Sequence, residues 1–345
     1  MFIQIYKVTS PSVIEEFIDC LDYNETTPLV KVDTMAICKA DIRYFLGNRS
    51  KYILDHKYPL APIHEAVGEI VKDPTNTFKK GDKVILIPNY VNHNFCQDCN
   101  HKRCHDNELG ENYCPYAKFK SSSSDGFMRS FYACTPDLLV KYDSSISPSI
   151  AVWSELLSVS NAACRRIDMK NVQDIALFGD GIMGYMVYIL LTKKYKKNVT
   201  VFGIDDKKLS MFKDAKIAKF EEYHGKTFDT LIEAVGGKPS EYAINNMIDI
   251  SSIGADLILM GVSEEGVTIN TRKVLEKGLS LKGVTRSSRE DFEEVAKLIC
   301  QKDVQEDIIP LILSYETINS VNDIYRHFEL DINNKTSIGK HIMKF

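Results

Sequence analysis

Apolar residues recur with different spacings in different parts of the chain. Up to about residue 145, short alternating or apolar runs are separated by Gly, Pro and Asn, a pattern typical of strands joined by turns. These runs lie at Thr27–Val32, Val67–Val71, Lys83–Ile87 and Phe131–Ala133. From residue 171 to about residue 275, apolar runs alternate with helical patterns, and residues 276 to 345 combine helices with a closing strand at Gly339–Lys344. The sequence therefore predicts an α/β protein in which a domain of alternating strands and helices is inserted late in a β-rich domain.

The most informative stretch runs from Asp174 to Asp206. A short apolar run predicts a buried parallel strand, and three glycines spaced G-x-G-x-x-G, a helical pattern and a second apolar run follow. The turn contains Gly179, Gly181, Ile182, Met183 and Gly184. In such a turn the first glycine permits a sharp bend, the second lets a pyrophosphate approach, and the third allows helix and strand to pack closely. Three glycines alone could serve only a tight turn, but in this context they predict a dinucleotide-binding site.

The end of the second strand indicates which dinucleotide is bound. NAD-binding proteins place Asp or Glu there to bind the 2′-hydroxyl of the adenosine ribose. If the strand ends at Phe202, Gly203 occupies this position, and Lys207 and Lys208 follow shortly after. A missing carboxylate with two lysines behind it favours the 2′-phosphate of NADP(H). A shift of two residues would instead place Asp205 there and favour NAD.

Composition narrows the class of protein. The chain has 345 residues, a net charge of -4, 44% hydrophobic and 26% charged residues, which is ordinary for a soluble globular protein of two domains. We expect no nucleic-acid or membrane partner, because there is no basic excess and no long apolar run. Nine cysteines and no charged-then-apolar leader favour a reducing, cytoplasmic location with metal-binding or structural thiols.

Three short segments carry candidate chemistry. Cys38 follows an apolar run, His64 and Glu65 adjoin at the start of a predicted strand, and Glu155 enters an apolar helix. Each could be unremarkable by itself: a buried thiol, a hydrogen-bonded histidine, a solvated acid. Together, upstream of a nucleotide fold, a thiolate, an imidazole and carboxylates indicate a catalytic zinc site.

The order of these motifs resembles the zinc-containing medium-chain dehydrogenase/reductase superfamily over essentially the whole chain. Within it, the chain is similar to the polyol dehydrogenases and closer to the ribulose-5-phosphate reductases, which make ribitol 5-phosphate for CDP-ribitol in teichoic-acid and capsule synthesis. The matching segments are residues 81–84, 124–128, 155–166, 228–237, 243–245, 261–264, 270–272 and 275–279. The resemblance implies a GroES-like catalytic domain (residues 1–150 and 276–345), a Rossmann NADP-binding domain (151–275) and a zinc lobe (93–116). It also implies NADPH as the reductant.

Carried over by position, Cys38, His64 and Glu65 would bind zinc, and Glu155 would be either a fourth ligand or the carboxylate that holds a zinc-bound water. Zinc would polarise the carbonyl of a ketose for hydride transfer. Two departures from the family pattern stand out. Ala40 replaces a Ser or Thr that starts a proton relay, so protons would pass through water, with Glu65 or Glu155 as candidate groups. Ile63 replaces a glycine before the histidine, and Asp41 matches a common acidic position with an expected structural role.

The lobe contains a second cluster of thiols. Many superfamily members hold a structural zinc here with four closely spaced cysteines. Cys96, Cys99, Cys104 and Cys114 lie in a polar loop with longer gaps than usual. We expect them to hold a structural zinc, with His93, His101 or His105 able to replace one of them.

A phosphorylated substrate requires cations near the metal. The candidates are Lys39, Arg43, Arg129 and Arg286, with Tyr44 as a pocket residue. Arg43 and Arg286 are preferred, although most Lys and Arg side chains are simply surface charges.

The sequence therefore predicts a zinc- and NADPH-dependent reductase that converts D-ribulose 5-phosphate to D-ribitol 5-phosphate. Two other hypotheses are an NAD-dependent polyol dehydrogenase acting on an unphosphorylated sugar alcohol and a non-catalytic nucleotide-binding partner of a nucleotidyltransferase. We expect a homodimer that pairs through residues 255–260 or the segment after them. Association with a cytidylyltransferase is compatible with this activity.

Overall fold

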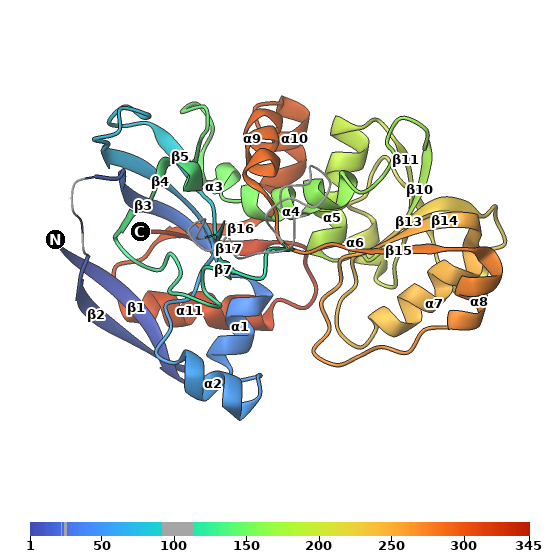
Figure 1. The fold of residues 1–345 in the computed structure, drawn as a ribbon, viewed down its shortest axis with the longest axis horizontal. Coiled ribbons are helices and arrows are strands. Elements are labelled where there is room, and N and C mark those ends of the chain that lie inside the picture. Colours follow the sequence, from blue (N-terminus) through green and yellow to red (C-terminus); the bar gives the residue numbers. More distant parts are fainter. Residues whose placement is uncertain (22, 24–25, 92–112) are drawn as a thin grey trace. The chain divides into compact units, whose positions relative to one another are not determined.

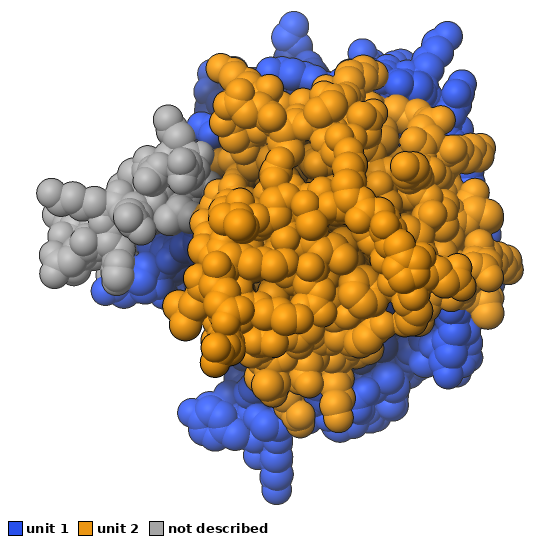
Figure 2. All heavy atoms as spheres, turned by 90° about the vertical axis from the view of Figure 1, so that its right-hand side faces the viewer, with its two compact units in different colours: residues 1–155, 287–335, 339–345 blue, residues 156–286, 336–338 orange. Residues whose placement is uncertain are grey.

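The chain forms two units, which are described separately. The computed structural model describes residues 1–21, 23, 26–91 and 113–345 (Figure 1). Unit 1 comprises residues 1–155, 287–335 and 339–345, and unit 2 comprises residues 156–286 and 336–338, drawn in blue and orange in Figure 2. No helix among the described residues is long and apolar enough to cross a membrane.

Unit 2 is built on a parallel sheet of six strands with the order β12-β11-β10-β13-β14-β15. Its strands are β10 (Asp174–Phe178), β11 (Asn198–Phe202), β12 (Lys216–Ala218), β13 (Phe228–Glu233), β14 (Ser251–Leu259) and β15 (Ser280–Gly283). The helices are α4 (Ser154–Cys164), which begins in unit 1, α5 (Ile182–Ile189), α6 (Asp206–Leu209), α7 (Ser240–Ile250) and α8 (Thr271–Lys277). A π-helical turn (Leu190–Lys194) continues α5, and a 3-10 turn (Phe220–Glu222) follows β12. The first strand lies in the middle and the chain winds outward in both directions, which is the doubly wound arrangement of nucleotide-binding domains.

Apolar side chains fill both faces of this sheet. β10 and the end of β11 are almost wholly buried, as the continuous apolar runs predict. The rings of Phe178 and Phe202 stack 4.5 Å apart across these two strands. Residues of α7, such as Ile244 and Met247, pack on the same cluster. The central strand and its neighbours are therefore held rigidly at the end where the glycine turn begins.

Unit 1 contains a larger, mostly antiparallel sheet with the order β16-β17-β3-β4-β5-β9, and β8 also pairs with β3. Its strands are β3 (Leu29–Ala36), β4 (Glu65–Lys72), β5 (Lys83–Leu86), β8 (Phe131–Ala133), β9 (Leu139–Lys141), β16 (Ile312–Thr317) and β17 (Lys340–Lys344). Two hairpins lie outside it, formed by β1 (Phe2–Ser10) with β2 (Val13–Cys20) and by β6 (Asn89–Val91) with β7 (Ala117–Phe119). The helices are α1 (Lys39–Phe45), α2 (Lys51–Lys57), α3 (Pro148–Ala151), α9 (Arg289–Leu298), α10 (Lys302–Ile308) and α11 (Val321–Asn333), with 3-10 turns at Pro136–Leu138 and Ile309–Leu311.

The apolar face of helix α11 packs against the core of unit 1. Ile324 and Phe328 are fully buried in the main core cluster of unit 1, and the Phe328 ring lies 4.6 Å from that of Phe45. Tyr325 Oη accepts a hydrogen bond from Ile14 N (2.6 Å), which ties the helix to β2. Asp323 closes a capping box with Ser320 at the start of the helix. The helix therefore begins directly after Ser320 and extends to Asn333.

Three features of the layout bear on the sequence-based expectation. Strand β14 lies between β13 and β15, so this edge of the sheet is formed by β15, which follows the segment 255–260, and not by that segment itself. Because β15 belongs to the sheet of unit 2, that unit continues to Arg286, beyond the boundary expected at residue 275. The first passage between the units falls at residues 155/156 and not at 150/151. The short edge strand carries too few apolar residues to be recognised from the sequence.

A candidate metal centre and a nucleotide-binding turn

The register of the unit 1 sheet brings the candidate metal ligands together. Ala36, the last residue of β3, pairs with Glu65 at the start of β4 and with Ile342 of β17. Cys38 follows β3 as the cap residue of α1, and His64 directly precedes β4. Segments that are distant in the sequence therefore meet at one end of the sheet.

Three possible ligands form a cluster in this region. One ligand atom each from Cys38, His64 and Glu65 lies within 4.8 Å of the other two. His64 and Glu65 are buried, and Cys38 is partly exposed. Thiolate sulfur, imidazole nitrogen and carboxylate oxygen are the donors that catalytic zinc uses, with one position left for a substrate. Among the described residues, this is the group of His, Cys, Asp and Glu side chains that could hold a metal ion.

The orientation of His64 is fixed by contacts to its Nδ1 atom. Ser121 Oγ lies 2.7 Å from Nδ1, and Asp41 Oδ1 lies 3.7 Å from the same atom. The ring of Phe119 lies 5.1 Å from the imidazole ring. These contacts leave Nε2 as the nitrogen for a metal, in the arrangement in which a carboxylate orients a metal-binding histidine.

Asp41 has more than the structural role expected from the sequence. Its carboxylate accepts hydrogen bonds from Cys38 N (2.9 Å) and Ile63 N (3.0 Å), and it is fully buried. Burial by itself raises the pKa of Asp41, but the charge of His64 and the hydrogen bonds outweigh this effect and lower the pKa below its ordinary value. One carboxylate thus fixes the backbone on both sides of the cluster and faces the imidazole.

Ile63 occupies a position where the family has glycine. Its φ of +76° lies in the left-handed region, which a β-branched residue rarely adopts. Hydrogen bonds from Ile63 N to Asp41 and from Phe127 N to Ile63 O (2.7 Å) hold it there. The conformation that positions His64 is therefore the same one that a glycine would adopt without strain.

The electrostatics of the cluster suit a cation. Burial lowers the pKa of His64, but the charges of Asp41 and Cys38 outweigh burial and raise it well above its ordinary value. A site that stabilises a proton on a buried imidazole has an excess of negative charge. A divalent metal would supply the positive charge instead, so the residues present fit zinc.

Glu65 has a cationic partner that the sequence did not suggest. Lys340, at the start of β17, is buried and places Nζ 2.5 Å from both carboxylate oxygens of Glu65. Burial lowers the pKa of Lys340, but Glu65 and Cys38 raise it to about 12. A metal would therefore have to share Glu65 with Lys340.

Glu155 lies in the first turn of α4 and is buried. Burial raises its pKa to about 7; Glu65 adds to this rise, whereas the positive charges of His64 and Lys340 oppose it. These influences place Glu155 near the cluster, although it is not one of the three mutually close ligands.

Only part of the predicted cysteine lobe can be described. Cys114 is buried beside Val91 and Ala117. Cys96, Cys99 and Cys104, together with His93, His101 and His105, lie outside the described residues.

The predicted substrate residues lie in different environments. Lys39 is exposed and Arg43 half-buried on α1, while Tyr44 is buried with the Arg49 guanidinium 5.1 Å from its ring. Arg129 is buried and donates from Nε to Gly126 O (2.9 Å), with Asp125 3.8 Å from its guanidinium. Arg129 is therefore engaged in holding the 125–129 loop. Arg286 belongs to unit 2, has φ +58°, and burial lowers its pKa.

The glycine turn of unit 2 has the close contacts that its spacing predicts. Gly179 has φ +129°, and a Cβ there would lie 2.8 Å from Ala234 O. A Cβ at Gly184 would lie 2.0 Å from Gly179 O, so turn and helix are in direct contact. Gly181 is the cap residue of α5, and a Cβ there would meet no atom of the described residues within 4 Å. The backbone beside Gly181, followed by Ile182 and Met183 in the first turn, is thus open for a pyrophosphate.

The loop after β11 follows the register that places Gly203 at the position of the ribose-binding acid. β11 ends at Phe202, and Asp205 instead caps α6 by accepting from Lys207 N and Lys208 N. Lys208 Nζ lies 3.7 Å from the Asp205 carboxylate, and Lys207 is exposed. Asp180, in the glycine turn, places its carboxylate against this loop.

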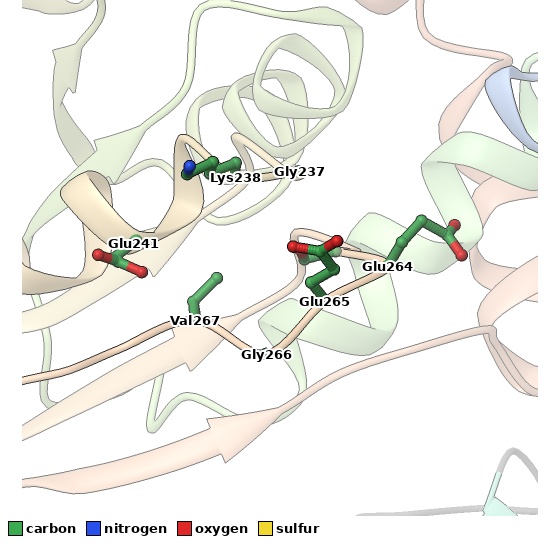
Figure 3. A pocket seen from close by; sticks show the side chains of 8 residues that line it. Gly237, Lys238, Glu241, Glu264, Glu265, Gly266 and Val267 are labelled. Atoms are coloured by element: carbon green, nitrogen blue, oxygen red, sulfur yellow. The ribbon is translucent and has the colours of Figure 1, made fainter. Parts of the chain in front are cut away.

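A hollow of about 270 Å³ lies in unit 2 between the start of α7 and the loop that follows β14. It is lined by Gly237, Lys238, Glu241, Ser263, Glu264, Glu265, Gly266 and Val267 (Figure 3). Three of the four charged side chains are acidic, so this hollow does not favour an anion.

Sequence reasoning missed Ser121, Phe119, Lys340 and Asp180 and underrated Asp41. Ser121 lies in a run of four serines, and Lys340 is 275 positions from Glu65. The capping position of Asp41, three residues after Cys38, is the one signal that could have revealed a direct link to the cluster.

Together, these features are those of a nucleotide-dependent oxidoreductase. Residues 24–144 match the alcohol dehydrogenase GroES-like domain, which confirms the predicted fold of unit 1. The chain is 38% identical to ribulose-5-phosphate reductase 1 of Staphylococcus aureus and 33% identical to ribulose-5-phosphate reductase of Bacillus spizizenii. Each alignment covers 100% of this chain and 99% of the relative.

Solved structures agree with this likeness. The crystal structure of S. aureus TarJ in complex with NADPH matches with a TM-score of 0.85 at 35% identity, covering 100% of this chain and 99% of that one. L-idonate 5-dehydrogenase from Escherichia coli has the same fold, with a TM-score of 0.85 at 17% identity over the same shares of the two chains. The chain belongs to the medium-chain dehydrogenase/reductase family, and its full-length relatives include the ribulose-5-phosphate reductases.

Proposed function

We propose that this protein reduces D-ribulose 5-phosphate to D-ribitol 5-phosphate with NADPH, at a zinc ion held by Cys38, His64 and Glu65. The observation that carries the proposal is the buried cluster of sulfur, nitrogen and oxygen donors in a chain that is similar over its full length to ribulose-5-phosphate reductases. The product would supply CDP-ribitol for cell-surface polymers, as the resemblance implies.

Each residue of the cluster has a distinct role in this proposal. When bound, zinc supplies a Lewis acid that polarises a ketone. Asp41 and Ser121 hold His64 so that Nε2 faces the metal. Lys340 places its ammonium group against both carboxylate oxygens of Glu65 and so balances the charge of this ligand in the buried site. Ala40 provides no hydroxyl for a proton relay, so water carries the proton.

The phosphate of the substrate needs a cationic partner. Arg129 donates from Nε to Gly126 O and lies beside Asp125. Arg43 and Arg286 are half-buried, and we propose them as phosphate-binding residues. Forked, charge-assisted contacts to phosphate are typical of arginine.

The test of function is a comparison of initial rates with both cofactors and both sugars. NADPH and NADH oxidation are measured with D-ribulose 5-phosphate and with D-ribulose. We expect the highest kcat/KM with NADPH and the phosphorylated sugar. Faster turnover of NADH with D-ribulose would favour a polyol dehydrogenase, and bound zinc with no turnover of either sugar would contradict the proposed substrate.

We also propose one catalytic and one structural zinc per chain, the latter at Cys96, Cys99, Cys104 and Cys114. Metal analysis of the purified protein tests this number. A content of one zinc per chain that disappears in a Cys38 variant would contradict the structural site.

A homodimer that pairs through β15 is a further part of the proposal. Among the described residues β15 lies at the edge of its sheet, and Leu275 of the preceding α8 is 81% exposed. Light scattering at micromolar concentration checks it, and a monomer would contradict it. Association with a cytidylyltransferase stays a prediction that co-elution of the two proteins would test.

A further inference from the structure

Asp180 links two parts of the nucleotide-binding region. It is the residue between Gly179 and Gly181, in the turn that follows β10. Its Oδ2 atom accepts hydrogen bonds from Ile204 N (2.7 Å) and Asp205 N (2.8 Å), which belong to the loop after β11. The described residues give Oδ1 no hydrogen bond. One carboxylate therefore holds the ribose-side loop while keeping an acceptor oxygen available.

The absence of a side chain at Gly203 is coupled to Asp180. A Cβ atom at position 203 would lie 2.7 Å from both Cβ and Oδ2 of Asp180. It would also lie 2.8 Å from Leu209 Cδ2, so a side chain at position 203 would require both Asp180 and Leu209 to move. The acid that is missing from the end of β11 is thus replaced, at nearly the same place, by an acid from the glycine turn.

Three lysines of this region, Lys207, Lys208 and Lys219, are matched in number by three acids, Asp180, Asp205 and Asp206, so the loop has no excess of positive charge. Lys208 lies 3.7 Å from the Asp205 carboxylate, and Lys219 binds Asp206 (2.7 Å) and the carbonyl oxygen of Ile204 (2.9 Å). A 2′-phosphate placed here would meet the carboxylate of Asp180 and would find the N–H groups of Ile204 and Asp205 already occupied. A ribose 2′-hydroxyl could instead donate to Asp180 Oδ1.

We propose that Asp180 determines cofactor specificity: its carboxylate replaces the missing acid at position 203, favours the unphosphorylated adenosine ribose, and so limits the preference for NADPH over NADH. This inference rests on the proposed function only in placing the nucleotide at the glycine turn. It concerns nucleotide binding and is independent of which sugar is reduced.

The test measures nucleotide affinity without sugar. Dissociation constants of NADPH and NADH are determined by nucleotide fluorescence for the unmodified protein and for Asp180→Asn, whose amide oxygen can still accept from Ile204 N and Asp205 N. Loss of the negative charge should raise the ratio Kd(NADH)/Kd(NADPH) about tenfold or more, with tighter binding of NADPH. Asp206→Asn is the matched control, because it removes one nearby exposed charge without touching the Ile204 and Asp205 N–H groups, and it should shift the ratio less than threefold.

The inference is overturned if the ratio in Asp180→Asn stays within threefold of the unmodified protein, falls, or rises equally in Asp206→Asn. No binding of either nucleotide to the unmodified protein would overturn the proposed function and this inference together. Sugar turnover that is lost while both nucleotides bind would count against the proposed substrate alone.

A second measurement needs no variant. In competition with the bound cofactor, 2′,5′-ADP should bind the unmodified protein less than about tenfold more tightly than 5′-ADP, because Asp180 offsets the attraction of the lysines. A preference of a hundredfold or more for 2′,5′-ADP would contradict the role given to Asp180.

Discussion

The metal centre of unit 1 and the nucleotide-binding turn of unit 2 are assembled in different ways. The turn is local: Gly184 contacts Gly179 O, and both lie within one strand–turn–helix segment. The metal centre gathers Cys38, His64, Ser121 and Lys340 from separate segments of unit 1, and Glu65 and Lys340 are 275 positions apart. A local motif carries its own geometry, whereas a centre built from distant segments depends on the register of the whole sheet.

The largest effect is expected for a metal ligand. Replacing Cys38 with Ser removes the thiolate from the cluster, and loss of the Lewis acid should reduce kcat/KM by about 10³-fold or more. Zinc content should fall by one ion per chain. Cys300→Ser is the matched control, because Cys300 is an exposed cysteine of the same unit. Equal activity and zinc content in the two variants would remove Cys38 from the site.

The Lys340→Met variant tests whether Lys340, which is distant in the sequence, stabilises Glu65 in the metal centre. This change leaves Glu65 buried without its cation, which should lower the free energy of unfolding of zinc-free protein by about 3–5 kcal/mol. The loss should be smaller in zinc-loaded protein, since the metal offers Glu65 a second positive partner. Urea unfolding with and without zinc measures both values.

Lys344→Met provides the control for that experiment. Lys344 is an exposed lysine at the other end of the same strand, and its replacement should have little effect. If Lys340→Met and Lys344→Met are equally stable without zinc, the Glu65–Lys340 pair does not support the centre.

Two alanine substitutions test whether Gly184 packs against its own turn and whether Gly181 leaves room for the nucleotide. Gly184→Ala would place a Cβ 2.0 Å from Gly179 O and should destabilise the protein by about 1–3 kcal/mol through overpacking. The added Cβ in Gly181→Ala would meet no atom within 4 Å in the part of the chain that the structure describes, so this variant should keep nearly unchanged stability and bind NADPH more weakly.

Thermal unfolding and nucleotide fluorescence separate these two effects. Gly266→Ala is the control outside the turn: its Cβ would also lie more than 4 Å from every described atom, so it should change neither property. Equal loss of stability in the Gly181 and Gly184 variants would show that the turn is not packed as described.

A smaller effect is expected for the carboxylate behind His64. In Asp41→Asn, the amide oxygen can still accept the hydrogen bond from Cys38 N, but the negative charge that faces the imidazole of His64 is lost. Zinc affinity should fall about 10- to 100-fold, as measured by competition with a chelator. Asp55→Asn, an exposed acid on α2, should leave the affinity unchanged, and equal affinities in the two variants would limit Asp41 to its backbone contacts.

The sequence was most informative where structure is local. The strands and helix around Gly179–Gly184 were predicted correctly because apolar periodicity and glycine spacing depend on neighbouring residues. Cys38, His64 and Glu65 were found because their residue types are typical of zinc ligands, and the structure does bring them together. Lys340 could not be found, since nothing near it in the sequence indicates that β17 would pair with β3.

Short elements and contacts between loops could not be predicted from the sequence either. β15 has four residues, so its apolar pattern was too short to show that unit 2 continues past residue 275. The position of Asp180 against Gly203 depends on a contact between two loops. Only the structure reveals that the missing acid and the acid of the glycine turn are related.

The most direct test of the account is a zinc titration of chelator-treated protein, followed by NADPH oxidation with D-ribulose 5-phosphate. If Cys38, His64 and Glu65 hold the catalytic metal, activity is absent in zinc-free protein, returns with added zinc, and does not return in Cys38→Ser. Full activity of zinc-free protein, or equal recovery by Cys38→Ser, would contradict the assignment of this cluster as the catalytic site.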